Sequence, residues 1–379
     1  MVKNTFDKKI DRTQSNSDKW NKYKGKDIIP MWVADMDFES PKEIIEALQD
    51  RVSHGVFGYT PLDDETLDAF IDFVKRHYNW DIKKEWVLFS YGVVISMNFT
   101  CKTVDSKEVI INTPIYPHFY KAPKNMGAKT IEVPMIEKNN RWSVDFEKFE
   151  NSITKDCKLF LLCNPHNPGG TVFTKEELEK FAAIAKKHNL IVCSDEIHSD
   201  LIVNPNVKHI PIASLNEDIA QNSITLLAPS KTFNIAGLKS SFVIIPNDSL
   251  RREYKKQMRG LVDDPNILAS IATKIAYKEC DNWINELREY LRENLKIVQK
   301  FVANNPSLKL LDQDATFLAW IDTSGLNHNN PYELFLDYGV GLSEGKPFGD
   351  KNFVRLNFGT SKEVLKEALK RMQKAIDDL

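Results

Sequence analysis

Short apolar runs alternate with stretches of helical periodicity between residues 86 and 245. The runs cover residues 86–89, 109–111, 158–163, 190–193 and 224–228. Each is too short for a buried helix and ends at polar or turn-forming residues, so we interpret them as buried strands. The stretches between them have the spacing of surface helices, as after the start signal at Thr174 and Glu177. This alternation predicts an α/β fold with a mainly parallel central sheet flanked by helices.

The pattern changes on both sides of that region. Residues 30–38 are apolar without periodicity, which predicts an extended arm that packs against the body. Two helices should follow, one opened by a capping box at residues 40–43 and one that starts at Thr60 and Pro61. After Pro265 long helices, notably over residues 282–304, give way to short strands near 316–321 and 353–357 and to a final helix from about 360.

The length of 379 residues favours about two domains. We expect an arm at residues 1–45 that joins the small domain. A large ligand-binding domain should span 46–275, and a small α+β domain should span 276–379.

Composition narrows the class of protein. The formal charge of -2 gives no overall attraction to nucleic acid or anionic membranes, and no apolar run approaches the roughly 18 residues of a membrane span. Residues 1–11 are too polar for a signal peptide. The 5 cysteines are odd in number and form no Cys-x-x-Cys pair, which is typical of a reducing compartment. We expect a soluble, cytoplasmic enzyme.

Polar groups follow each of the five apolar runs. They occupy residues 90–92, 112–116, 164–170, 194–198 and 229–231. The carboxyl ends of parallel strands share one edge of a sheet, and ligands bind there. We therefore expect these five segments to meet at one crevice.

Lys231 follows the last of the runs, between Ser230 and Thr232. Burial disfavours its ammonium form, so the amine can become neutral and attack a carbonyl to form a Schiff base. An exposed loop lysine is the alternative.

The other strand ends offer partners for such a carbonyl ligand. Asp195 would pair with a protonated ring nitrogen, Asn167 could donate to a phenolate or carboxylate, and Tyr116 could stack on a ring. Backbone N–H groups of Gly92 and Val93 could hold a phosphate at a helix start. Ser230 and Lys239 could add to that phosphate site. Each residue has a structural alternative, but together they describe pyridoxal 5'-phosphate (PLP).

Several segments carry a family resemblance. Residues 230–238, 164–168 and 195–201 resemble fold-type I PLP enzymes of the class I/II aminotransferase superfamily. Residues 31–38, 58–60 and 355–359 are similar to its cystathionine β-lyase branch, the carbon–sulfur lyases of the MalY/PatB type.

The resemblance implies roles for individual residues. Lys231 would form the Schiff base, with Asp195 on the pyridine nitrogen, Asn167 at the 3'-oxygen and Tyr116 stacked on the ring. Substrate would contact Asn167 and the residues Trp32, Val33, Ala34 and Arg355, of which Arg355 would bind the α-carboxylate. Tyr59 would reach the phosphate of the other subunit of a homodimer. His198, also counted among the cofactor-binding residues, stands where transaminases usually have tyrosine, which favours the lyase branch.

The predicted reaction is β-elimination from cystathionine or other S-substituted cysteines, releasing a thiol, pyruvate and ammonia. Lys231 and Tyr116 are the candidates for protonating the leaving sulfur. An aminotransferase is the first alternative, and a catalytically silent regulatory protein is the second. The glycines at 339, 341 and 345 lack dinucleotide-binding spacing, and the 8 histidines lack metal-ligand spacing, so we expect no nicotinamide, flavin or metal.

Overall fold

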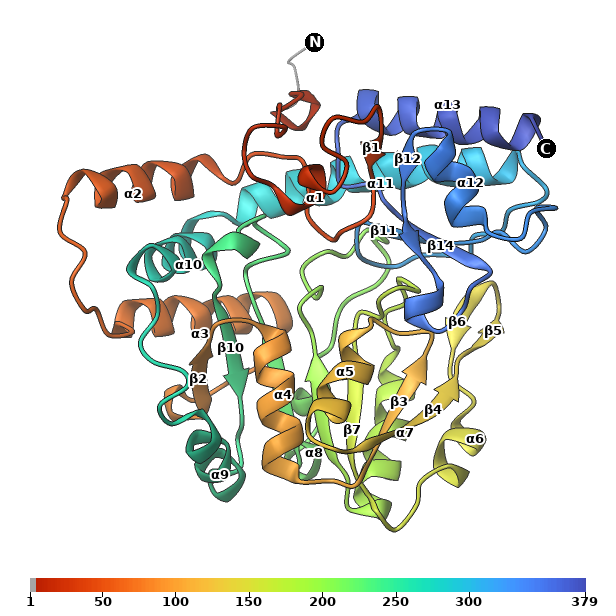
Figure 1. Ribbon diagram of the computed structural model, residues 1–379. Coiled ribbons are helices and arrows are strands. Elements are labelled where there is room, and N and C mark those ends of the chain that lie inside the picture. The colour runs from red at the N-terminus through yellow and green to blue at the C-terminus, as the bar shows by residue number, and fades with distance from the viewer. Residues whose placement is uncertain (1–4) are drawn as a thin grey trace.

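A seven-stranded sheet forms the centre of the protein, whose computed structural model describes residues 5–379 (Figure 1). Residues 1–4, which open the predicted arm and the polar amino-terminal segment, lie outside the described residues. The strands of this sheet are β2 (Val87–Ser90), β3 (Glu108–Thr113), β4 (Lys129–Pro134), β7 (Cys157–Cys163), β8 (Ile191–Asp195), β9 (Ser223–Leu227) and β10 (Ser241–Ile244).

The strand order is β2-β10-β9-β8-β7-β3-β4, and β10 runs antiparallel to both of its neighbours. The other six strands run in one direction. All five predicted runs are strands here, and their carboxyl ends share one edge of the sheet. The predicted α/β class with a mainly parallel sheet is confirmed.

Helices cover both faces of the sheet (Figure 1). One face carries α4 (Val93–Val104), α5 (His118–Asn125) and α9 (Asp248–Met258), and the other carries α6 (Phe146–Asn151), α7 (Lys175–His188) and α8 (Glu217–Gln221). Along β7, Leu159 and Leu161 pack into the apolar cluster shared with α4, α5 and α9. Phe160 and Leu162 point to the other face and pack into the cluster shared with α6, α7 and α8. Because both faces are buried, the strands are continuous apolar runs.

The helix starts test the predicted capping signals. Thr174 Oγ1 accepts from Glu177 N at 3.2 Å, and Glu177 Oε2 accepts from Thr174 N at 2.9 Å, so the capping box of α7 forms. The box predicted at residues 40–43 is wrong: Pro41 is the N-cap of α2 (Lys42–Ser53), and Ser40 Oγ donates to Asn234 O instead.

The second predicted helix start is also misplaced. Helix α3 (Asp64–Tyr78) begins after Asp63, whose side chain accepts from Thr66 N at 2.6 Å. The aspartate caps the helix more effectively than the Thr60-Pro61 pair because its oxygen satisfies a first-turn N–H.

A separate apolar cluster, above the sheet in Figure 1, joins the arm to the carboxyl-terminal part of the chain. Phe6, Met31, Met36 and Phe38 of the arm pack with side chains of α11 (Asp281–Ala303), β11 (Leu318–Asp322), β14 (Phe353–Asn357) and α13 (Lys362–Asp377). The predicted packing of the arm is confirmed. In this part of the chain β11, β14 and β13 (Ser343–Glu344) form a sheet, and β1 (Ile29–Pro30) pairs with β12 (Val340–Gly341).

Several further elements complete the described chain. They are α1 (Asp18–Asn21), α10 (Ile267–Glu279), α12 (Pro331–Asp337), the hairpin of β5 (Ile136–Lys138) and β6 (Arg141–Ser143), and the 3-10 helices Thr5–Asp7, Lys84–Trp86, Ile212–Ser214, Ala236–Leu238 and Lys346–Phe348. No helix within residues 5–379 combines the length and apolarity needed to cross a membrane. The five cysteines are free and buried.

Candidate active site

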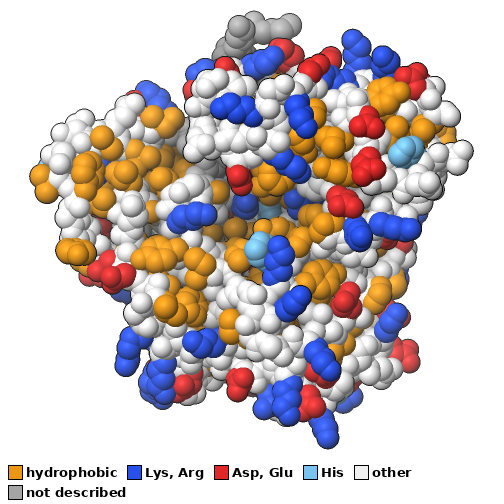
Figure 2. Space-filling model, in the orientation of Figure 1, with side chains coloured by type: hydrophobic (Ala, Val, Ile, Leu, Met, Phe, Trp, Pro, Cys, Tyr) orange, Lys and Arg blue, Asp and Glu red, His pale blue; other side chains and the backbone are white. Residues whose placement is uncertain are grey.

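A cavity of about 870 Å³ opens at the carboxyl edge of the central sheet. Its mouth is the hollow near the centre of the face in Figure 2, bordered by hydrophobic and basic side chains and by a few acidic ones. The predicted site residues that line it are Trp32, Val33, Ala34, Gly92, Val93, Tyr116, Asn167, Asp195, His198, Ser230, Lys231, Lys239 and Arg355. The strand ends therefore converge on one crevice, while the role of each residue remains a prediction.

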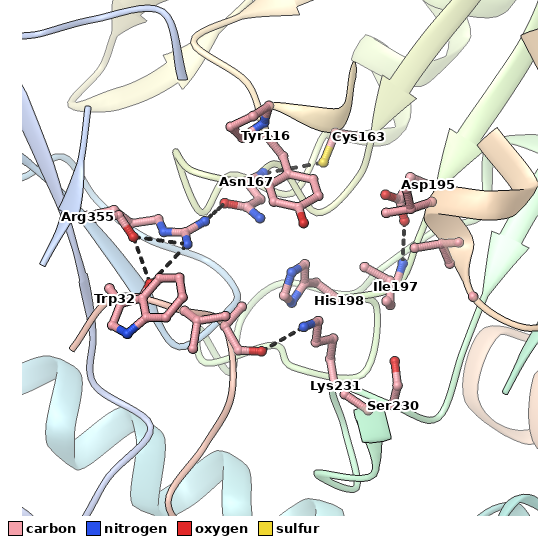
Figure 3. Close-up of a pocket in the computed structure, with 18 of the residues that line it drawn as sticks. Trp32, Tyr116, Cys163, Asn167, Asp195, Ile197, His198, Ser230, Lys231 and Arg355 are labelled. Atoms are coloured by element: carbon pink, nitrogen blue, oxygen red, sulfur yellow. Dashed lines mark hydrogen bonds between the residues drawn. The ribbon is translucent and has the colours of Figure 1, made fainter. Parts of the chain in front are cut away.

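Lys231 lies in the wall of this cavity, four residues after the end of β9 (Figure 3). Its Nζ donates to Ala34 O at 2.7 Å. Burial lowers the pKa of Lys231 to about 8, and Arg355 and Lys239 act in the same direction, while Asp35 and Asp195 oppose them. A pKa near 8 leaves about one amine in ten neutral at pH 7, which makes Lys231 a competent nucleophile.

Asp195 occupies the opposite side of the cavity from Arg355 (Figure 3). Its Oδ1 accepts from Ile197 N at 3.2 Å, and the residue is only 5% exposed. Burial raises the pKa of Asp195 to about 7, Glu196 adds to the increase, and Lys231 opposes it. A buried carboxylate with so little compensation is suited to a cationic partner.

Arg355 enters from β14 and is almost fully buried. Its Nη1 donates to Asn167 Oδ1 at 2.9 Å, and its Nη2 donates to Trp32 O at 3.1 Å. Among the described residues its Nε has no hydrogen-bond partner. Burial lowers the pKa of Arg355 to about 10, so the guanidinium remains charged at neutral pH and can accept an anion.

Tyr116 and His198 add two rings to the cavity wall. The Tyr116 backbone N–H donates to Asn167 O at 3.0 Å, which ties the loop after β3 to the loop after β7. Burial raises the pKa of Tyr116, so its hydroxyl keeps its proton at neutral pH. Burial, with Lys231 and Arg355 nearby, lowers the pKa of His198 to about 3, and its buried Nδ1 has no partner among residues 5–379.

The amino end of α4 faces the same cavity through Gly92 and Val93. Gly92 has φ of 149°, a conformation that favours glycine, and no side chain caps the helix among the described residues. The first-turn N–H groups and the helix dipole are therefore available to an anion. Ser230 and Lys239 line the cavity as well, so a phosphate there would have a hydroxyl and an ammonium within the same wall.

Tyr59 alone of the predicted residues does not line the cavity of its own chain. It lies in the exposed segment between α2 and α3, and its side chain is fully exposed. The structure of a single chain therefore does not test its predicted contact with the other subunit.

Two asparagines, to which the sequence assigned no role, hold the arm over the cavity. Asn357 Nδ2 donates to Val33 O at 2.6 Å and to Asp35 O at 2.9 Å. Asn234 Nδ2 donates to Met36 O and Phe38 O. With Lys231 on Ala34 O and Arg355 on Trp32 O, side chains bind almost every carbonyl of residues 32–38. Asn357 follows Arg355 by two residues, on the same face of the strand, which is the signal that could have identified it.

Comparison with known proteins gives a consistent set of relatives. Residues 26–372 match the family model described as aminotransferase class I and II. Cystathionine beta-lyase PatB of Bacillus subtilis is 37% identical, over 98% of this chain and 99% of PatB. The crystal structure of OvoB superimposes with a TM-score of 0.96 at 43% identity and 98% coverage of both chains. The PLP-bound C-S lyase of Staphylococcus hominis has a TM-score of 0.92 at 30% identity, covering 98% of this chain and 97% of that one.

Proposed function

The chain belongs to the aminotransferase class I and II family, and we propose that it is a PLP-dependent carbon–sulfur lyase. Its substrates are cystathionine or other S-substituted L-cysteines. With one water, each turnover gives a thiol, pyruvate and ammonia, and the thiol from cystathionine is homocysteine. The observation that carries the proposal is a lysine amine of lowered pKa in one cavity with a buried carboxylate and a buried guanidinium.

The residues of the cavity fit PLP. Asp195 lacks a cation, the first turn of α4 lacks an anion, and the buried Nδ1 of His198 lacks a partner among the described residues. A pyridinium nitrogen, a phosphate and a ring oxygen would satisfy these three groups in turn. Tyr116 then supplies the ring for stacking, and Lys231 supplies the amine that binds the aldehyde carbon.

Arg355 orients the substrate. Its charged guanidinium and unpartnered Nε match an α-carboxylate, and Asn167 holds the guanidinium plane in place. The arm carbonyls that bind Arg355 and Lys231 keep both groups against the same side of the cavity. Closure of the arm over the substrate would exclude water from the reacting carbon.

PLP supplies an electron sink that acidifies the α-carbon of a bound amino acid. Lys231 Nζ then removes the α-proton, because its lowered pKa leaves part of the amine neutral at neutral pH. Loss of the thiolate from the β-carbon follows. Lys231 carries the proton it has gained, and Tyr116 keeps its own at neutral pH, so either can protonate the leaving sulfur.

We also propose that the protein forms a homodimer, which an exposed apolar surface supports. Val52, Val56 and Phe57, on α2 and the segment after it, are each at least half exposed. Hydrophobic side chains gather on this side of the molecule in Figure 2. Ile95 is exposed as well and lines the cavity, so a partner covering it would border the active site. Tyr59 would then reach the partner's phosphate site.

We also retain the division of the chain into an arm (1–45), a large domain (46–275) and a small domain (276–379) as a proposal. The apolar cluster shared by the arm and the carboxyl-terminal elements supports it. Five buried, unpaired cysteines support a reducing compartment such as the cytoplasm.

One incubation tests the reaction. Purified protein loaded with PLP is given S-ethyl-L-cysteine, and pyruvate and free thiol are measured. The lyase produces both in equal amounts, with Lys231→Ala as the inactive control. An aminotransferase would instead need a 2-oxo acid acceptor and would leave the sulfur on the product, which would overturn the proposal.

A further inference from the structure

Two charged side chains of the cavity wall have no role in the chemistry described above. Lys231, Asp195, Lys239 and Arg355 serve the cofactor and the α-carboxylate, which leaves Lys22 and Glu344. Neither makes an ion pair with any residue in the described part of the chain. Both are therefore available to the only part of the substrate still without a partner, which is the group on sulfur.

Lys22 is held at the mouth of the cavity by aromatic rings. It lies at the carboxyl end of α1 and is exposed. Its Nζ is 4.5 Å from the ring centroid of Trp32, 5.2 Å from that of Tyr23 and 6.0 Å from that of Tyr332. These separations fall within the range of cation–π attraction, so the ammonium has a preferred position although no carboxylate holds it.

Trp32 links this ammonium to the substrate site. Its indole Nε1 donates to Lys19 O at 3.0 Å, which fixes the ring, and its carbonyl accepts from Arg355 Nη2 at 3.1 Å. Figure 3 shows the Trp32 ring beside Arg355 and facing the cavity. One residue thus contacts both the arginine proposed for the α-carboxylate and the lysine at the mouth. The two cations are consequently placed for two separate anions on one ligand.

We propose that Lys22, positioned by Trp32, binds a carboxylate at the far end of the sulfur substituent. It thereby selects substrates whose leaving thiol carries a carboxylate. This rests on the proposed lyase function and adds a specificity determinant to it. Glu344, on the same wall, would accept from an ammonium on the same substituent. The pair therefore favours a thiol that carries both groups, as an amino-acid thiol does.

The test compares two substrates of nearly the same shape. S-(2-carboxyethyl)-L-cysteine carries the distal carboxylate, and its amide, S-(2-carbamoylethyl)-L-cysteine, does not. We expect Lys22→Met to lower the acid-to-amide ratio of kcat/KM about fivefold, the size of an exposed ion pair. Lys22→Arg should retain most of the ratio, and added salt should reduce it in the wild type. Lys24→Met, two residues away, exposed and outside the cavity wall, is the matched control and should leave the ratio unchanged.

Two results would overturn the assignment of Lys22. One is an unchanged ratio in Lys22→Met, and the other is an equal loss on both substrates, which would indicate a packing role against Trp32. Failure of the proposed function looks different, because the wild type would then release neither pyruvate nor thiol from either substrate.

Discussion

Replacing Asp195 with asparagine should stabilise the cofactor-free protein while weakening its affinity for PLP. Burial raises the pKa of Asp195 to about 7, from the ordinary aspartate value of 3.8. Below pH 4 the carboxyl is protonated in both folded and unfolded chains and contributes nothing. As the pH rises from 4 to 7 the unfolded chain ionises first, so the folded state loses stability. Above pH 7 the loss is constant.

The size of the effect follows from the shift. Roughly three pKa units at 1.36 kcal/mol each amount to about 4 kcal/mol above pH 7, and about one unit of that cost is already present at pH 5. Asparagine keeps an oxygen that can accept from Ile197 N and removes the titration. The free energy of unfolding of the variant, relative to the wild type, should therefore rise by about 3 kcal/mol between pH 5 and pH 8.

Thermal unfolding of the cofactor-free proteins measures this difference. For a chain of this length, about 3 kcal/mol corresponds to a Tm increase of roughly 4 °C. Saturating PLP should reverse the order, because its ring cation pairs with Asp195 and not with the amide, so the wild type gains more Tm. A Tm difference between variant and wild type that does not grow from pH 5 to pH 8 without cofactor, or equal protection by PLP, would refute the reasoning.

Three further predictions concern single groups. Arg355→Lys should lower kcat/KM for S-ethyl-L-cysteine at least 100-fold, because lysine lacks the forked guanidinium that binds both Asn167 and the α-carboxylate. A loss below tenfold would contradict the assignment. The rate at which cofactor-free protein captures PLP should rise with pH, reach half its maximum near pH 8 and level off above about pH 9, because burial lowers the pKa of Lys231 to about 8 and only the neutral amine reacts. A rate still rising steeply above pH 9.5 would contradict this. Thr174→Ala should remove the capping box of α7 at a cost of about 1 kcal/mol, or roughly 1 °C in Tm, with kcat unchanged; a fall in kcat would show coupling to the site.

The strand ends were predictable because the same residues carry both signals. The run that forms β8 is apolar up to Cys193 and then presents Asp195, so the burial pattern and the chemistry coincide. The rule that parallel strands end at one edge then brings Asp195, Asn167 and Lys231 together without any knowledge of loop geometry. Strand β10 was not predicted, and it is the antiparallel exception in the sheet.

Contacts that depend on tertiary placement were not predictable. Ser40 has the sequence of a helix cap, but its hydroxyl donates to Asn234 O in the loop after Lys231. Asn234 binds the arm through backbone carbonyls, which carry no sequence signal. The position of Lys22 over Trp32 likewise requires α1 to lie against the segment that carries Trp32.

Reduction of the PLP-loaded protein with borohydride, followed by peptide mapping, tests the central claim most directly. Borohydride fixes the cofactor to the amine that holds it. We expect the pyridoxyl group on Lys231, in a single peptide, and no incorporation in Lys231→Ala. A label on any other lysine, or equal labelling of the Lys231→Ala protein, would contradict the account.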